Sequence, residues 1–272
     1  MFNTLMGRFG GFAGSGTRQI DITMAPPAVS TPTIVDFNTV SLYRFTANTA
    51  GTNDAPGQWT FSVLGSDIAV SLEAVGGGGA GGFGSSGPPA QLQQGVPGAN
   101  TTITGPGSLS VSAGGGGAGR GGSRYGPYGP PPNNGGSGAG GIASGGNTNT
   151  DGNAGAGGNQ GGNPSPTGFP GQAGATVAPA YFTPLGQSGS GTGGRGGGPD
   201  NAGYSQGPGG GGGGGGSAAY VLKTHTLIGG QTYNIVVGGK GIQPAAGAPN
   251  YSAGSPDVPA TNQPGGAKIT IT

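Results

Sequence analysis

The residue types that most often do chemistry are few in this chain and widely spaced. The single histidine, His225, lies between two threonines in a strand-like stretch, a setting more typical of a structural residue than of a catalytic base or metal ligand. The carboxylates occur singly, at Asp21, Asp36, Asp54, Asp67, Glu73, Asp151, Asp200 and Asp257. No two are spaced as an acid–base pair, although distant residues can meet in a fold. We therefore predict no catalytic, cofactor or metal site, and a protein that is not an enzyme.

Cysteine is absent from the chain, so disulfides, thiolate catalysis and cysteine-ligated zinc are excluded. Glycine-rich strings match nucleotide-binding loops by chance in such a composition, and no helical period follows any of them. Arg120, Arg124 and Arg195, with Tyr125 and Tyr128 nearby, have the residue types of RNA-binding segments. In a chain of net charge +1 they would release few counterions, so we predict no nucleic-acid partner.

Aromatic side chains in the connectors between glycine tracts are better candidates for binding. Rings on loops between rigid segments suit stacking on sugars or filling a receptor pocket. The candidate receptor-binding residues are Arg124, Tyr125, Tyr128, Phe169, Tyr181, Phe182 and Tyr204. The alternative is that these side chains cover the ends of the glycine-rich block as small local cores.

Composition restricts the architecture strongly, because 72 of the 272 residues are glycine and 24 are proline. An ordinary globular domain is excluded, which leaves a collagen triple helix, a disordered tract or a packed array of extended segments. The glycines lack the three-residue period of collagen. Only 6% of residues are charged and 7% are aromatic, so charge repulsion does not favour an open chain. Packed segments and disorder remain as alternatives for the glycine-rich part.

Alternation of apolar and polar residues, which indicates β-strands, occurs near both ends of the chain. The stretches are 40–46, 59–63, 68–75, 217–228, 232–237 and 267–272. Gly229-Gly-Gln231 separates two of them and predicts a β-hairpin. Two further strand-like pieces lie within 101–111. The fold class predicted is therefore mostly β and irregular, with a strand platform formed by both chain ends.

Three regions follow from this pattern. Residues 1–38 are expected to be an extended arm with one short strand at Ile20 and Ile22. Residues 39–75 and 217–272 are expected to form the platform, and 76–216 to be an inserted glycine-rich block. Its glycine-rich stretches lie near 76–87, 114–122, 135–162, 189–198 and 207–216.

The arm carries apolar side chains that are candidates for attachment to a partner: Phe2, Leu5, Met6, Phe9 and Phe12. The alternative is a frayed terminus. No run approaches the ~18 apolar residues that span a bilayer, and residues 1–10 lack an apolar signal core. We expect neither membrane insertion nor classical secretion.

Two stretches resemble a known family. In 60–82 a strand runs directly into Gly76-Gly-Gly-Gly-Ala-Gly-Gly82, and in 210–241 a glycine tract runs back into a strand. These stretches, with the closing strand at 265–272, resemble the glycine-rich domains of phage tail-fibre proteins and of tail-fibre-tip adhesins. A glycine-rich domain of certain receptor kinases is also similar. The irregular, asparagine-rich region 135–162 departs from the regular adhesin pattern.

The resemblance implies a sandwich of polyglycine-II helices whose distal loops contact a host surface receptor. We therefore expect a virion tail-fibre or tail-tip protein whose partners are other virion subunits and a host surface protein or glycan, with homo-oligomerisation as an option. Two alternatives remain. One is a virion scaffold or decoration protein, and the other is a bacterial surface or matrix protein located at the cell surface or outside the cell.

Overall fold

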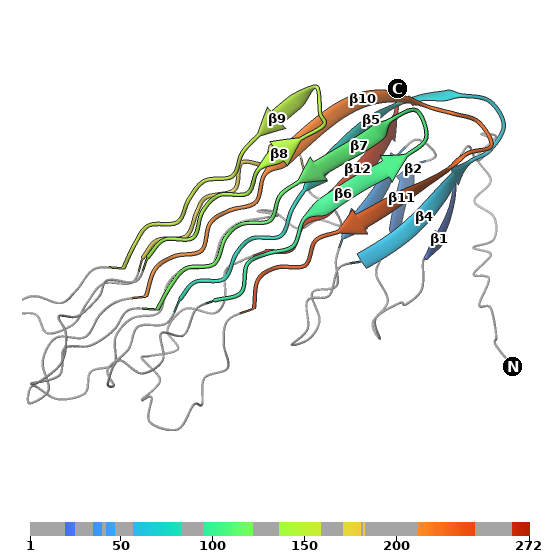
Figure 1. Ribbon diagram of the computed structural model, residues 1–272. Helices are drawn as coiled ribbons and strands as arrows, with labels where there is room; N and C mark the ends of the chain where they lie inside the picture. The colour runs from blue at the N-terminus through green and yellow to red at the C-terminus, as the bar shows by residue number, and fades with distance from the viewer. Residues whose placement is uncertain are drawn as a thin grey trace, which may run out of the picture.

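The computed structural model describes residues 20–24, 35–39, 42–46, 57–82, 95–121, 136–158, 171–180, 182, 212–242 and 263–272. Within these ranges the chain consists of β-strands and irregular segments, without a helix, and the strands form two antiparallel sheets (Figure 1). The predicted fold class is confirmed at this level.

The strands of each sheet come from distant parts of the chain. In spatial order the first sheet contains β1 (Ile20–Met24), β4 (Gly57–Val63), β11 (Thr232–Val237), β6 (Thr101–Gly105), β7 (Leu109–Ala113) and β8 (Ala143–Ser144). The second contains β2 (Val35–Thr39), β3 (Leu42–Thr46), β12 (Gly266–Ile271), β5 (Ile68–Val75), β10 (Tyr220–Leu227) and β9 (Thr148–Thr150). The last strand, β12, pairs with β3 on one side and β5 on the other, so the two ends of the chain are joined within one sheet.

Every stretch with apolar alternation forms a strand, and the 101–111 region holds β6 and β7 as predicted. β1 includes the expected strand at Ile20 and Ile22. Two results differ from the prediction. β2 lies at the end of the region expected to be an arm, and β8 and β9 lie within 135–162, where no alternation is visible. The interval expected to be one glycine-rich block therefore contains four strands, β6 to β9.

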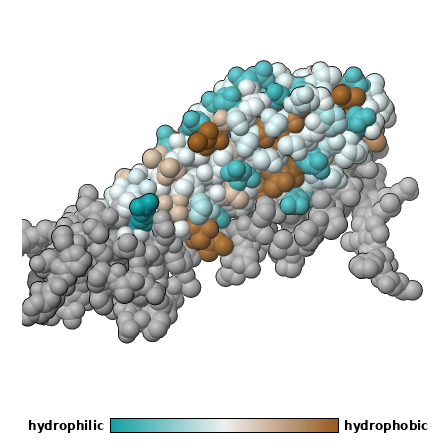
Figure 2. All heavy atoms as spheres, viewed as in Figure 1, coloured by the Kyte–Doolittle hydropathy of each residue, from teal (hydrophilic) through white to brown (hydrophobic). Residues whose placement is uncertain are grey.

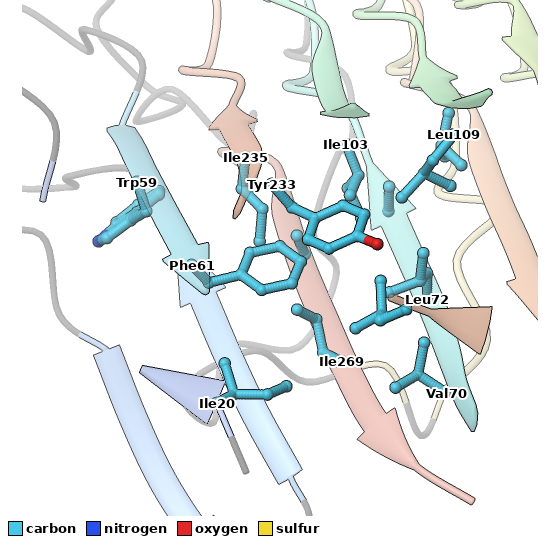
Figure 3. Close-up of a cluster of buried hydrophobic side chains, with 14 of the residues drawn as sticks. Ile20, Trp59, Phe61, Val70, Leu72, Ile103, Leu109, Tyr233, Ile235 and Ile269 are labelled. Carbon is cyan, nitrogen blue, oxygen red and sulfur yellow. The ribbon is translucent and has the colours of Figure 1, made fainter. Parts of the chain in front are cut away.

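The core lies between the two sheets and is formed by alternate residues of the strands. Trp59, Phe61 and Val63 of β4 are buried, and Val70 and Leu72 of β5 face them from the other sheet. Figure 3 shows the side chains of Phe61, Tyr233 and Leu72 lying close together in this core. Full burial of each large apolar side chain stabilises the fold by about 1.5–3 kcal/mol. This core holds the two sheets together without any disulfide.

The hairpin predicted at Gly229-Gly-Gln231 is wrong. β10 belongs to the second sheet and pairs with β5 and β9, whereas β11 belongs to the first and pairs with β4 and β6. Residues 228–231 therefore cross from one sheet to the other. The Tyr233 hydroxyl accepts a hydrogen bond from Ile228 N at 2.7 Å, and the Tyr233 ring stacks on Phe61 with centroids 5.1 Å apart. These contacts hold β11 beside β4. The turn residues alone do not determine whether β11 pairs with β4 or with β10.

Candidate functional site

Extended glycine-rich segments continue the strands of both sheets beyond the sandwich (Figure 1). From the first sheet these are 95–100 before β6, 114–121 after β7, 136–142 before β8 and 238–242 after β11. From the second they are 76–82 after β5, 151–158 after β9, 212–219 before β10 and 263–265 before β12. Segment 171–177 hydrogen-bonds alongside them. Each segment is thus positioned by a strand that is fixed in the core, or by neighbours that are.

Hydrogen bonding in these segments repeats every three residues. The N–H groups of Gly76, Gly79 and Gly82 all donate to segment 212–219, with N···O distances of 2.8 to 3.3 Å. The N–H groups of Gly77 and Ala80 donate instead to another segment, 95–100. A β-strand alternates with a period of two and bonds only within its sheet. Here the backbone bonds connect the continuations of the two sheets as well as neighbours within each.

Two of these segments, 76–82 and 212–219, are surrounded by the others, and we call them the inner segments. The first is bonded to 95–100, 114–121, 212–219, 238–242 and 263–265. The second is bonded to 76–82, 114–121, 136–142, 151–158 and 171–177. Every residue of both inner segments is buried. The backbones of five other segments therefore pack directly against each of them.

Glycine is required at particular positions of the inner segments, where there is no room for a side chain. An ideal Cβ built on Gly79 would lie 2.0 Å from the carbonyl oxygen of Gly117, and one on Gly216 would lie 1.9 Å from that of Ala139. A Cβ on Gly215 would lie 2.2 Å from the oxygen of Gly79. These obstacles are backbone atoms, which cannot turn aside as a side chain can. This close approach explains why glycine stands at 214–216 in the sequence.

At the end of the array away from the sheets, the described segments end and the next ones begin. Near that end Arg120 N donates to Gly136 O at 2.8 Å, so the stretch between 121 and 136 begins and ends there. The same holds for the stretch between 158 and 171, where Ala156 N donates to Gln172 O at 2.9 Å. The candidate receptor-binding residues Arg124, Tyr125, Tyr128, Phe169, Tyr181 and Tyr204 lie outside the described residues, as do the attachment candidates Phe2, Leu5, Met6, Phe9 and Phe12.

Phe182 is the one receptor-binding candidate that the structure describes, and it is buried. Its side chain is 2% exposed and contacts the Tyr220 ring edge-on, with centroids 6.0 Å apart. Val75 and Ala218 complete this small cluster on the second sheet. Phe182 therefore belongs to a small local core, which is the alternative stated above for these candidates. The sequence did not distinguish it from the adjacent Tyr181.

A buried charged cluster lies beside Phe182 and was missed by the sequence analysis. A Glu73 carboxylate oxygen lies 2.6 Å from Lys268 Nζ, and its other oxygen accepts a hydrogen bond of 2.7 Å from the Tyr220 hydroxyl. Lys268 Nζ also lies 5.8 Å from the centroid of the Phe182 ring. In the sequence Glu73 looks like an isolated carboxylate, because its partner Lys268 follows almost two hundred residues later. Both oxygens have partners, which indicates a structural role for this carboxylate.

His225 lies on β10, and its Nε2 atom has no hydrogen-bond partner among the described residues. Burial lowers the pKa of its imidazole, and the neighbouring Lys223 charge lowers it further. The ring is therefore neutral at neutral pH. Within the described ranges, no group of three His, Asp or Glu residues is placed to hold a metal ion.

On the face in Figure 2 the apolar residues form separate small patches among polar ones. Exposed large apolar side chains include Leu64, Val96, Ile142, Ile228 and Ile242. None of the described residues belongs to a helix long and apolar enough to cross a membrane. Comparison of the chain with protein-family models, curated proteins and solved structures gave no match.

Proposed function

We propose that this protein is a non-enzymatic structural component of a virion tail fibre or tail tip, and that its glycine-rich segments are polyglycine-II helices. The observation that carries the proposal is the three-residue repeat of backbone hydrogen bonds in 76–82, with each set of donors directed to a different neighbour. A polyglycine-II helix is the glycine form of the polyproline-II conformation, which has three residues per turn and leaves its backbone groups free to bond outward.

Such a bundle is suited to a mechanical role. Its cohesion comes from backbone hydrogen bonds in several directions, and it needs neither disulfides nor a large apolar core along its length. The sandwich supplies the apolar core at one end, where Trp59, Phe61 and Tyr233 are buried. The result is a rigid body that can carry connectors at its other end.

Binding to the host surface is assigned to those connectors. Arg124, Tyr125 and Tyr128 belong to the stretch that begins and ends at the end of the array away from the sheets. Binding groups on a rigid support lose less conformational entropy on binding than groups on a mobile one. Tyrosine and arginine are also the residue types that contribute most binding energy in recognition surfaces. The arm with Phe2 and Phe9 is assigned to attachment to another virion subunit.

The receptor assignment is tested with fluorescently labelled purified protein and a panel of bacterial strains. We expect saturable binding to cells of susceptible strains, reduced at least about tenfold by Tyr125→Ser together with Tyr128→Ser. The matched control is Leu64→Ser, an exposed apolar residue in the loop between β4 and β5 at the opposite end of the array. Equal losses in both variants, or release of sugars from the cell surface by the purified chain, would contradict the proposal.

Hydrogen exchange tests the bundle itself. We expect slow exchange at the amides of Gly79 and Gly216, whose N–H groups donate at 3.0 and 2.9 Å to neighbouring segments. Exchange at random-coil rates would mean a disordered spacer between two strand clusters. A receptor-binding failure with slow exchange would instead favour a scaffold or decoration protein.

A further inference from the structure

The buried ion pair of Glu73 and Lys268 holds an amine and a carboxyl group in contact. The two residues are paired directly across β5 and β12, and Lys268 Nζ lies 2.6 Å from Glu73 Oε1. Their side chains are only 12% and 6% exposed, so little water reaches the contact. Reacting groups held in this way behave as if at a concentration of about 10⁵–10⁸ M. An amine and a carboxyl group are the two components of an amide bond.

Apolar side chains surround this contact. The Phe182 ring lies 5.8 Å from Lys268 Nζ, and Leu222 is paired with Glu73 on the side away from β12. Burial disfavours the two charges, and transfer of one proton from Nζ to Oε1 removes both of them at once. The uncharged amine that results is the form of lysine that acts as a nucleophile.

The Tyr220 hydroxyl is bonded to the other oxygen of the same carboxyl group. It donates to Glu73 Oε2 at 2.7 Å, and its ring is buried and held edge-on by Phe182 with centroids 6.0 Å apart. When an amine attacks a carboxyl carbon, negative charge develops on the oxygen that stays. One fixed hydrogen-bond donor to such an oxygen typically accelerates the reaction by about 10²–10³. Tyr220 is therefore placed to stabilise the intermediate of amide formation.

We propose that Glu73 and Lys268 join spontaneously in an isopeptide bond, an amide between their side chains, and that the ion pair is the state before this bond forms. Lys268 Nζ passes one proton to Oε1, and the resulting amine forms a bond to Glu73 Cδ. The Cδ–Oε1 bond breaks, and Oε1 leaves as water with a second proton from Nζ. Oε2 becomes the amide carbonyl oxygen and keeps its hydrogen bond from Tyr220. The step needs no other reactant, oxidant or reductant.

The isopeptide bond closes a covalent ring that contains both inner segments. Residues 76–82 and 212–219, with the strands from β6 to β11, all lie between Glu73 and Lys268 in the chain. The sequence has no cysteine, so no disulfide can supply such a ring. A cross-link that closes a long loop stabilises the fold by restricting the unfolded chain. It also prevents the last strand, β12, from detaching from β5 under load.

The first test is the mass of the unaltered protein after denaturation, and it does not depend on any virion function. We expect a mass lower than that of the sequence by one water molecule. Trypsin is expected to release a branched peptide in which residues 45–120 are joined to 241–272, because a modified Lys268 is no longer a cleavage site. A mass equal to that of the sequence, or separate peptides ending at Arg120 and Lys268, would overturn the proposal.

The second test compares three variants by the same mass measurement. Lys268→Arg keeps the positive charge but has no nucleophilic amine, so it is expected to have its full sequence mass. Water loss that persists in this variant would overturn the assignment to the Glu73–Lys268 pair.

Tyr220→Phe keeps the ring and removes the hydroxyl, and it is expected to form the cross-link at least about tenfold more slowly in samples taken at intervals after purification. The matched control is Tyr233→Phe, which removes an equally buried hydroxyl whose partner is Ile228 N, and it is expected to cross-link as the unaltered protein does. Equal rates in the two tyrosine variants would overturn the role of Tyr220.

Discussion

The Lys268 side-chain nitrogen lies 2.6 Å from a carboxylate oxygen of Glu73, and the two residues occupy paired positions on β12 and β5. The pair is almost fully buried and joins the last strand of the chain to the strand that leads into an inner segment. Removing one member would leave the other charge buried without its partner, which is far more costly than the net contribution of an intact pair.

Lys268→Ala is therefore expected to destabilise the protein by about 3 kcal/mol. The free energy of unfolding from urea titration measures this loss. The control replaces both charges, Glu73→Gln together with Lys268→Met, and is expected to lose less than Lys268→Ala alone. A double variant less stable than the single one would show that the charges are strongly favourable in their own right.

Gly215→Ala is expected to be among the most disruptive single-methyl changes, because the new Cβ would meet the backbone of Gly79 at 2.2 Å. We expect a loss of more than about 2 kcal/mol, or failure to fold, by comparison with other overpacked sites. The contrasting variant is Gly65→Ala. Gly65 has φ +84° and no atom within 4 Å of an added Cβ, so it carries only the conformational cost of about 1–2 kcal/mol. Similar melting temperatures for the two variants would contradict the steric explanation.

Phe182→Ala is expected to lower stability by about 3 kcal/mol, the usual result of emptying a buried aromatic site. Binding of the folded variant to bacterial cells is expected to remain within about twofold of the unaltered protein. Full stability combined with lost binding would instead identify Phe182 as a receptor contact.

His225 gives the protein a pH dependence whose sign follows from its lowered pKa. The unfolded chain has the ordinary value near 6.5, so the unfolded state binds a proton more readily than the folded state as the pH falls below that value. Stability from this group is complete above pH ~6.5 and decreases toward the folded-state pKa. His225→Gln is expected to have a smaller difference in melting temperature between pH 7.5 and pH 5 than the unaltered protein. A larger difference in the variant would contradict the lowered pKa.

Local alternation was sufficient to predict most strands, because a strand with one face in a core must alternate. Trp59, Phe61 and Val63 show this in β4. The choice of partner was not predictable in the same way. The turn at 229–231 is compatible with a hairpin or with a crossing between sheets, and the distant contact between Tyr233 and Phe61 decides between them.

The asparagine-rich region 135–162 illustrates a second limit on predicting strands from the sequence. Asn147 Oδ1 accepts from Thr224 N at 2.8 Å, and Asn149 Oδ1 accepts from Gly146 N at 3.0 Å. These side chains close the crossing from β8 to β9 with polar contacts and leave no apolar period to detect. For the candidate site, glycine content predicted that segments could approach closely, but the identities of the inner ones depend on which strands precede and follow them.

The inner glycine segments cannot by themselves define their own alignment. One three-residue repeat of 76–82 is nearly indistinguishable from the next, so a slip of three residues along 212–219 would restore almost every backbone bond. The strands forbid that slip, since an odd shift of β5 would turn Leu72 and Val70 out of the core. The two sheets thus fix the alignment of all the glycine-rich segments along one another. It follows that the array of segments can be lengthened or shortened by whole three-residue repeats, provided that neighbouring segments change together, while the sheets remain unaltered.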